Sequence, residues 1–190
     1  GTLVGVHVGE VLVAASAPLA RWTTHKEHDH MHLSLLLQMA ADGMGDRVAM
    51  GSLTGGCTME ALAERARRAA QLFTECHGDK VAMVDLNSDA VPVALFGAAL
   101  ARKPFVPINY RLTDDQLRTI VARTAPSTVI VGEGVADRLG EIEDVELLSR
   151  KELLAVAEDP AAPQLEDDGL GDPDDIAILL FTSGTTGEPK

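Results

Sequence analysis

Residues 81–108 read VAMVDLNSDAVPVALFGAALARKPFVPI and decide the fold class. A strand-length apolar run, Val81–Leu86, is followed by the polar turn Asn87–Asp89 and by an apolar run of helix length around Val93–Leu100. We expect the polar turn to cap this helix. A second strand-length run, Phe105–Ile108, comes next. Because two parallel strands need a crossover connection between them, this succession predicts a parallel βαβ unit.

The same alternation of strand-length and helix-length runs continues on both sides of this unit, which predicts an α/β fold built of parallel βαβ units. The helices are predicted from apolar residues at helical spacing and from capping residues before the first turn. The remaining expected elements are, in chain order, a helix with Leu33, Leu36, Leu37 and Ala40 on one face, a strand over Arg47–Gly51, a helix from the N-cap Thr58 to Glu75, a helix that begins with the capping box Thr113 and Gln116, a strand over Thr128–Val131, a short helix that begins with the capping box Ser149 and Glu152, and a strand over Ile176–Phe181.

The charge of the chain argues against nucleic-acid binding. Its 190 residues include 16 Lys plus Arg against 29 Asp plus Glu, a formal net charge of -13, so the surface repels phosphate backbones and anionic lipid. Glu158–Asp175 holds eight of the acids and no base, among prolines and glycines. This pattern predicts a solvated connecting segment. Most of the negative net charge of the chain therefore lies in this one segment.

Membrane insertion and secretion are not expected. The apolar run Val91–Ala101 is too short to cross a bilayer. The apolar stretch Leu3–Ala20 lacks a positively charged region before it and is interrupted by His7 and Glu10, so it does not fit a signal peptide. A hydrophobic fraction of 46% with 24% charged residues is typical of a globular protein.

The cysteine content favours a reducing compartment. The chain has two cysteines, Cys57 and Cys76, in no CxxC pattern and in no disulfide framework. We expect both to be buried thiols and the protein to be cytoplasmic.

The last nine residues, 182–190, read TSGTTGEPK and follow an apolar strand directly. Glycines in such a loop allow positive φ and close backbone approach, so amide hydrogens can converge on phosphate oxygens, while hydroxyls and a lysine add donors and charge. The spacing fails the GxxxxGK[ST] template, because Pro189 stands where the second glycine should be. We therefore predict a phosphate-binding loop of another kind, formed by Thr182, Ser183, Gly184, Thr185, Thr186, Gly187 and Lys190.

This loop resembles the signature loop of the adenylate-forming enzymes, which include acyl-CoA synthetases, luciferases and the adenylation domains of peptide synthetases. A second stretch, Asn87–Leu117, resembles the helix, strand and turn in the amino-terminal part of acyl-CoA synthetases. Peptide-synthetase domains usually have an Asp-Pro pair where this chain has Asn109 and Tyr110. The resemblance therefore favours the acyl-CoA synthetase branch.

The resemblance implies a ligase that uses ATP, Mg and coenzyme A and activates a carboxylic acid, a fatty or an aromatic one. The loop would hold the β- and γ-phosphates of ATP. It also implies that the chain is an incomplete part of the large N-terminal domain, with the acyl pocket and the catalytic lysine beyond Lys190, so we expect no catalytic residue within it. A noncatalytic module that holds a nucleotide or a partner remains the alternative.

The resemblance and the composition together predict four segments. Residues 1–32 have no counterpart in the resemblance and are expected to be an N-terminal extension, either disordered or spurious. An α/β subdomain is expected over 33–157, the acidic linker over 158–175, and a strand with the truncated phosphate loop over 176–190.

Two other patterns are discounted as functional sites. Gly132 and Gly134 form only a partial dinucleotide-binding fingerprint, since Asp137 fills the third glycine position. Four histidines lie within eight residues, and imidazole is a common zinc ligand, but no cysteine is nearby and the segment is polar. We expect no metal site at His25, His28, His30 and His32.

Overall fold

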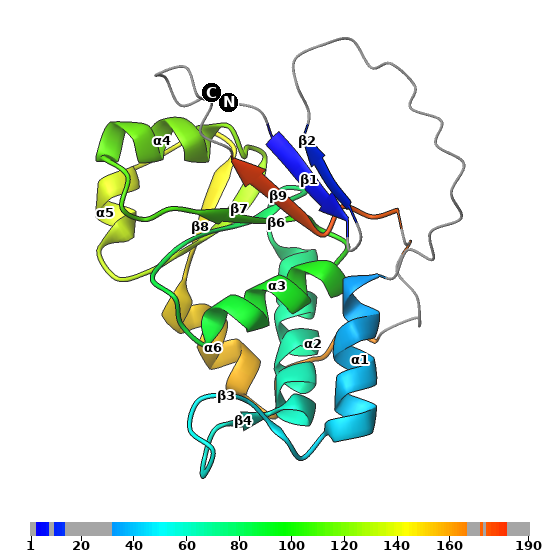
Figure 1. Ribbon diagram of the computed structural model, residues 1–190. Coiled ribbons are helices and arrows are strands. Elements are labelled where there is room, and N and C mark those ends of the chain that lie inside the picture. The colour runs from blue at the N-terminus through cyan, green and yellow to red at the C-terminus, as the bar shows by residue number, and fades with distance from the viewer. Residues whose placement is uncertain (1–2, 8–9, 14–31, 167–171, 173, 182–190) are drawn as a thin grey trace, which may run out of the picture.

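The computed structural model describes residues 3–7, 10–13, 32–166, 172 and 174–181, which form a sheet covered by helices on both faces (Figure 1). The strands of the large sheet are β1 (Leu3–His7), β2 (Glu10–Val13), β5 (Val81–Val84), β6 (Phe105–Ile108), β7 (Ser127–Val131), β8 (Val145–Ser149) and β9 (Ile178–Phe181). A separate hairpin pairs β3 (Val48–Met50) with β4 (Cys57–Thr58). The helices are α1 (Leu33–Met44), α2 (Met59–Glu75), α3 (Ala90–Leu100), α4 (Asp114–Ala122), α5 (Val135–Leu139) and α6 (Arg150–Glu158).

The large sheet has seven strands in the order β2-β1-β9-β6-β5-β7-β8. The five strands from β9 to β8 are parallel, with Val81 opposite both Phe105 and Thr128, and Ser127 opposite Val145. β1 pairs antiparallel with β9 and with β2. The predicted α/β fold of parallel βαβ units is therefore confirmed.

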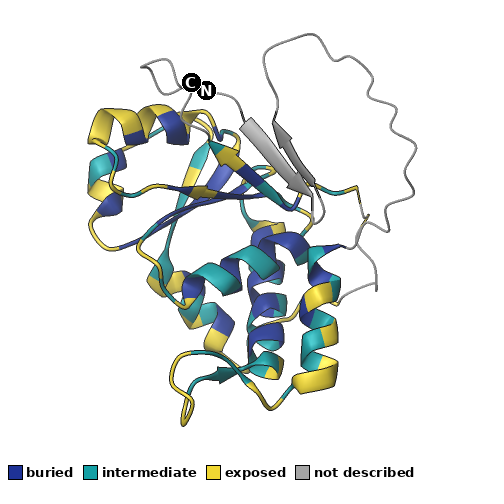
Figure 2. Cartoon of the chain, in the orientation of Figure 1, coloured by how far each residue is buried: buried dark blue, intermediate teal, exposed yellow. Residues whose placement is uncertain are grey.

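The helices form two layers around the sheet. α1, α2, α3 and α6 cover one face, and α4 and α5 cover the other (Figure 1). The buried sides of α2 and α3 face each other in Figure 2, and Phe73 lies in this core with no exposed surface. Gly97 allows the close approach of the two helices, because a Cβ there would stand 2.9 Å from the Cβ of Ala69 and 3.1 Å from the Phe73 ring.

β6 and β9 are paired over only a small part of their length. The Phe105 N–H donates to the Ala177 carbonyl at 2.9 Å, so this edge of β6 faces the segment that enters β9. Since alternate backbone nitrogens of a strand point the same way, the nitrogen of Pro107 faces the same edge, and it carries no N–H. The ladder register recorded between the two strands is the single pair Phe105 and Ile178.

Several local predictions are confirmed at the level of hydrogen bonds. Thr58 is the N-cap of α2, and its hydroxyl accepts from the Ala61 N–H. The capping boxes of Thr113 with Gln116 and of Ser149 with Glu152 are both formed in full.

Other local predictions are wrong. Asp89, in the predicted polar turn, is the N-cap of α3, which begins at Ala90, but its side chain makes no capping bond because its backbone is already helical. The two cysteines are free thiols, as expected, but Cys57 and Cys76 are half-buried because each lies at an end of α2 rather than within its core face.

The structure contains five elements that the sequence did not predict. β1 and β2 lie within the expected N-terminal extension, β4 directly precedes α2, and α5 and β8 lie between β7 and α6. Within the expected linker, the Leu165 N–H donates to the Arg67 carbonyl of α2 at 3.0 Å. The division of the chain into four segments stays a prediction.

Candidate functional site

The carboxyl ends of the five parallel strands meet at one edge of the sheet. The chain continues from β5 into Asp85, from β6 into Asn109, from β7 into Gly132 and from β8 into Arg150. The connection after β5 runs to α3 on one face, whereas that after the neighbouring β7 runs to α5 on the other. Adjacent strands whose connections diverge in this way leave a crevice, which is where open α/β sheets bind ligands.

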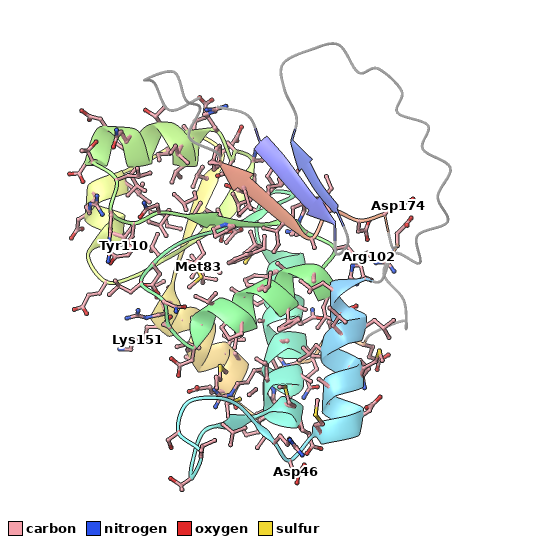
Figure 3. The ribbon with its side chains drawn as sticks, viewed as in Figure 1. Asp46, Met83, Arg102, Tyr110, Lys151 and Asp174 are labelled. Atoms are coloured by element: carbon pink, nitrogen blue, oxygen red, sulfur yellow. The ribbon has the colours of Figure 1, made fainter. Side chains whose placement is uncertain are left out.

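Two adjoining cavities open at this edge. One, of about 440 Å³, is lined by residues that follow β5, β6, β7 and β8, and the other, of about 730 Å³, lies between the end of β7 and the outer side of α6. Glu133 and Arg150 line both. Tyr110 of the first and Lys151 of the second project from the same side of the molecule in Figure 3. The crevice is therefore large enough for a small ligand, and its cations come from α5 and from the first turn of α6.

A buried ion pair joins the ends of β5 and β8. Arg150 Nη1 donates to both carboxylate oxygens of Asp85 at 3.0 Å, and the Leu86 N–H donates to Oδ1 at 2.7 Å. The Asp85 side chain is 2% exposed and that of Arg150 is 32% exposed. The carboxylate lies directly against Gly132 at the end of β7, where a Cβ would stand 2.1 Å from Oδ1.

A second arginine fixes the turn that follows β6. Arg138 of α5 donates from Nη1 to the Tyr110 carbonyl at 2.9 Å and from Nη2 to the Leu112 carbonyl at 2.6 Å. Its Nε donates to Asp114 Oδ1 at 2.7 Å. The Arg111 N–H closes the turn on Asn109 Oδ1 at 3.0 Å. All three guanidinium nitrogens of Arg138 are thus engaged, which holds Tyr110 at the cavity wall.

The capping box at the start of α6 fixes the position from which Arg150 extends. The Ser149 hydroxyl and N–H both donate to Glu152 Oε2, at 2.6 and 2.9 Å, and the Glu152 N–H donates back to the hydroxyl at 3.1 Å. The hydrogen bonds from Ser149 lower the pKa of the Glu152 carboxyl below its usual value. The first turn of α6 therefore keeps an ionised cap at neutral pH.

The strand that precedes the predicted phosphate loop in the sequence, β9, ends at the same edge of the sheet. β9 is parallel to β6 and ends at Phe181, whose ring lies 5.5 Å from the Arg123 guanidinium. The residues predicted to form the loop lie outside the described part of the chain. They are Thr182, Ser183, Gly184, Thr185, Thr186, Gly187 and Lys190.

The histidine group falls mostly outside the described part of the chain. His25, His28 and His30 are not described, whereas His32 is the buried N-cap of α1. Its Nδ1 accepts from the Ser34 N–H at 3.3 Å and lies 2.6 Å from the Ser34 hydroxyl. Among the described residues, no group of three or more His, Cys, Asp or Glu could hold a metal ion.

Sequence reasoning missed Asp85, Glu133, Arg138 and Arg150. Asp85 and Arg150 are 65 positions apart, so no local motif joins them. One available signal was an acid directly after a continuous apolar strand, which places it at the ligand-binding edge of a parallel sheet.

No helix of the described residues has the length and apolar character that a membrane span needs.

Comparison with known proteins agrees with this architecture. Feruloyl-CoA synthase from Amycolatopsis sp is 33% identical over 141 residues, which cover 71% of this chain and 28% of that protein. N-(5-amino-5-carboxypentanoyl)-L-cysteinyl-D-valine synthase from Amycolatopsis lactamdurans is 29% identical over 164 residues, which cover 83% of this chain and 4% of that protein. The inhibitor-bound N-terminal domain of FACL13 from Mycobacterium tuberculosis matches with a TM-score of 0.69 and 25% identity, over 84% of this chain and 43% of that one.

The chain thus spans less than half of each of these relatives, which include both a CoA ligase and a synthase of another kind. The family described as AMP-binding enzyme matches residues 37–190, most of the chain. The chain therefore belongs to the AMP-binding enzymes, the adenylate-forming ligases, and forms part of their N-terminal region.

Proposed function

We propose that the complete protein joins a carboxylic acid to coenzyme A at the expense of ATP. In the first step a carboxylate oxygen of the acid bonds to the α-phosphorus, the bond from that phosphorus to the bridging oxygen breaks, and pyrophosphate leaves. In the second step the coenzyme A sulfur bonds to the acyl carbon, AMP leaves with its oxygen, and the thiol proton passes to solvent.

The observation that carries this proposal is the family match, which extends through TSGTTGEPK to Lys190. In the proposal, the amides and hydroxyls of Thr182–Gly187 and the ammonium of Lys190 hold the β- and γ-phosphates and stabilise the charge of departing pyrophosphate. β9 supports this role, because it delivers the chain to the edge of the sheet where ligands bind. Bound Mg²⁺ would neutralise part of the phosphate charge.

Coenzyme A is the proposed acceptor because of the CoA-ligase relatives and because Asn109 and Tyr110 replace the Asp-Pro pair usual in peptide synthetases. The feruloyl and long-chain fatty-acid ligases among the relatives support an aromatic or a fatty acid as substrate. We place this reaction in the cytoplasm, where ATP and coenzyme A are available.

The test is exchange of labelled pyrophosphate into ATP by the complete protein, with a panel of fatty and aromatic acids, followed by detection of the acyl-CoA thioester. Lys190→Ala should lower the exchange rate about tenfold to a thousandfold, the usual effect of losing one preorganised charge at a phosphate. Lys80→Ala is the matched control, since Lys80 precedes β5 at the opposite edge of the sheet.

No exchange with any acid would contradict the ligase and favour a noncatalytic nucleotide-binding module. Exchange without thioester formation would support the adenylation step and contradict the proposal that coenzyme A is the acceptor. An unchanged rate in Lys190→Ala, with a normal melting temperature, would contradict the role of the loop.

A further inference from the structure

We propose that Arg150 binds a phosphate group of a nucleotide substrate and that Asp85 is its positioning residue. This inference rests on the proposed function and adds a contact outside the 182–190 loop. It follows from how the Arg150 guanidinium is held and from what surrounds it.

The ion pair uses only one nitrogen of Arg150. Nη1 donates to both oxygens of Asp85 at 3.0 Å, and within the described part of the chain Nε and Nη2 have no hydrogen-bond partner. The side chain is 32% exposed and lines both cavities. Arg150 therefore has unused donors at the wall that the two cavities share.

Among the described residues that line the two cavities, Arg150 and Lys151 are the cations with donors open to a ligand. Arg138 also lines the smaller cavity, but its three guanidinium nitrogens already donate to Asp114 and to two backbone carbonyls. Of the acids in the larger cavity, Glu158 is paired with Arg65 at 3.0 Å, and Glu133 is exposed. A planar guanidinium with parallel donors matches phosphate oxygens, so a phosphate fits this wall better than a neutral group.

Asp85 restricts where that guanidinium can go. The carboxylate is nearly fully buried, lies against Gly132 and accepts the Leu86 N–H, so it cannot follow Arg150 if the arginine moves. A guanidinium fixed in this way loses less side-chain entropy when it binds an anion. Three neighbouring strand ends, those of β5, β7 and β8, thus combine to present one arginine to the crevice.

A stabilising role and a binding role of the pair predict different results for single and double variants. Removing one partner of a buried ion pair is costly, whereas replacing both partners together is often neutral for stability. Stability and ligand binding can therefore be separated by comparing single variants with the double variant.

The test uses the complete protein with Arg150→Met, Asp85→Asn and the double variant, and measures the KM for ATP, for coenzyme A and for the acid, together with kcat and melting temperature. We expect Arg150→Met to raise the KM for one of the two nucleotides about tenfold to a hundredfold, the effect of losing a charged hydrogen bond. The kcat and the KM of the acid should change less than about threefold. The nucleotide that responds identifies the source of the phosphate.

The double variant should recover the melting temperature lost in the single variants and keep the raised KM. Asp85→Asn should raise the same KM by a smaller factor. Arg67→Met, which removes an arginine of α2 that donates to Gln38 Oε1 at 2.7 Å and lines neither cavity, is the control and should leave every KM unchanged.

A stable double variant with wild-type KM values would overturn the proposal, as would a rise in the KM of the acid alone. If the wild type shows no exchange activity, the proposed function fails, and calorimetric binding of ATP and of coenzyme A then decides the inference. Loss of nucleotide binding in the double variant would support it. Equal binding by both proteins, or no binding of either nucleotide by the wild type, would overturn it.

Discussion

Gly132→Ala should destabilise the fold through the Asp85 carboxylate. A Cβ at this position would stand 2.1 Å from Asp85 Oδ1 and 2.8 Å from Cγ, both below the 3.4 Å at which ordinary contacts begin. The Asp85 side chain is 2% exposed, so a carboxylate displaced from this position stays largely buried. The carboxylate must therefore rotate away from Arg150 and stay buried without its charged partner.

The size of the effect follows from that loss. An uncompensated buried charge costs about 3–5 kcal/mol when one partner of a buried pair is removed. Because Arg150 is partly exposed and can turn to water, we expect the low end, about 3 kcal/mol. For a protein of this size, each kcal/mol shifts the melting temperature by about 2–4 °C, so the midpoint should fall by about 6–12 °C.

Urea and thermal unfolding of the wild-type and variant proteins measure this effect. Gly43→Ala is the matched control, because a Cβ at Gly43 of α1 meets nothing within 4 Å and alanine favours helix by about 1 kcal/mol. In an Asp85→Ser background, which removes the carboxylate, Gly132→Ala should cost much less. A cost under about 1 kcal/mol in the wild-type background, or the same cost in both backgrounds, would refute this reasoning.

Three further predictions follow from the described contacts. Phe73→Ala should cost about 3–5 kcal/mol of unfolding free energy by urea titration, because Phe73 is fully buried, whereas Leu53→Ala, at a position 89% exposed, should change it by less than about 0.5 kcal/mol. Thr113→Ala should cost about 1 kcal/mol by removing one half of the capping box of α4, and Thr113→Ser should retain most of it. Burial raises the pKa of the Cys57 and Cys76 thiols, so a disulfide reagent near pH 8 should react with them more slowly in the native protein than in urea, and equal rates would contradict this.

The accuracy of the sequence-based predictions depended on how local the responsible interactions are. The capping boxes of α4 and α6 join residues three positions apart, so four residues of sequence contain the whole interaction. The Asn87–Asp89 turn looked equally suitable, but the Asp89 backbone is helical, whereas Thr113 and Ser149 have the extended backbone from which a side chain caps the first turn. Residue type therefore predicts where these helices start, but the capping bond also depends on the backbone conformation of the N-cap residue.

The candidate site depends on contacts that no local pattern contains. The ends of β5, β7 and β8 become neighbours only through the strand order, which places β7 between β5 and β8. α5 has only five residues and follows a glycine, and the apolar run of β8, an edge strand with the sequence VELLS, is interrupted by Glu146, so neither gives a strong signal. The sequence shows that Asp85 and Arg150 are present, but only the fold shows that the two side chains are in contact.

The position of Pro107 has a consequence during synthesis on the ribosome. β6 ends about 70 residues before β9 begins, so at about 5–20 residues per second its outer edge waits about 4–14 s for the strand that covers it. An uncovered strand edge can pair with another nascent chain, and proline at such an edge opposes this by removing a donor. Pro107 thus leaves this edge with one donor fewer for such pairing in the interval before the later segment of the chain arrives.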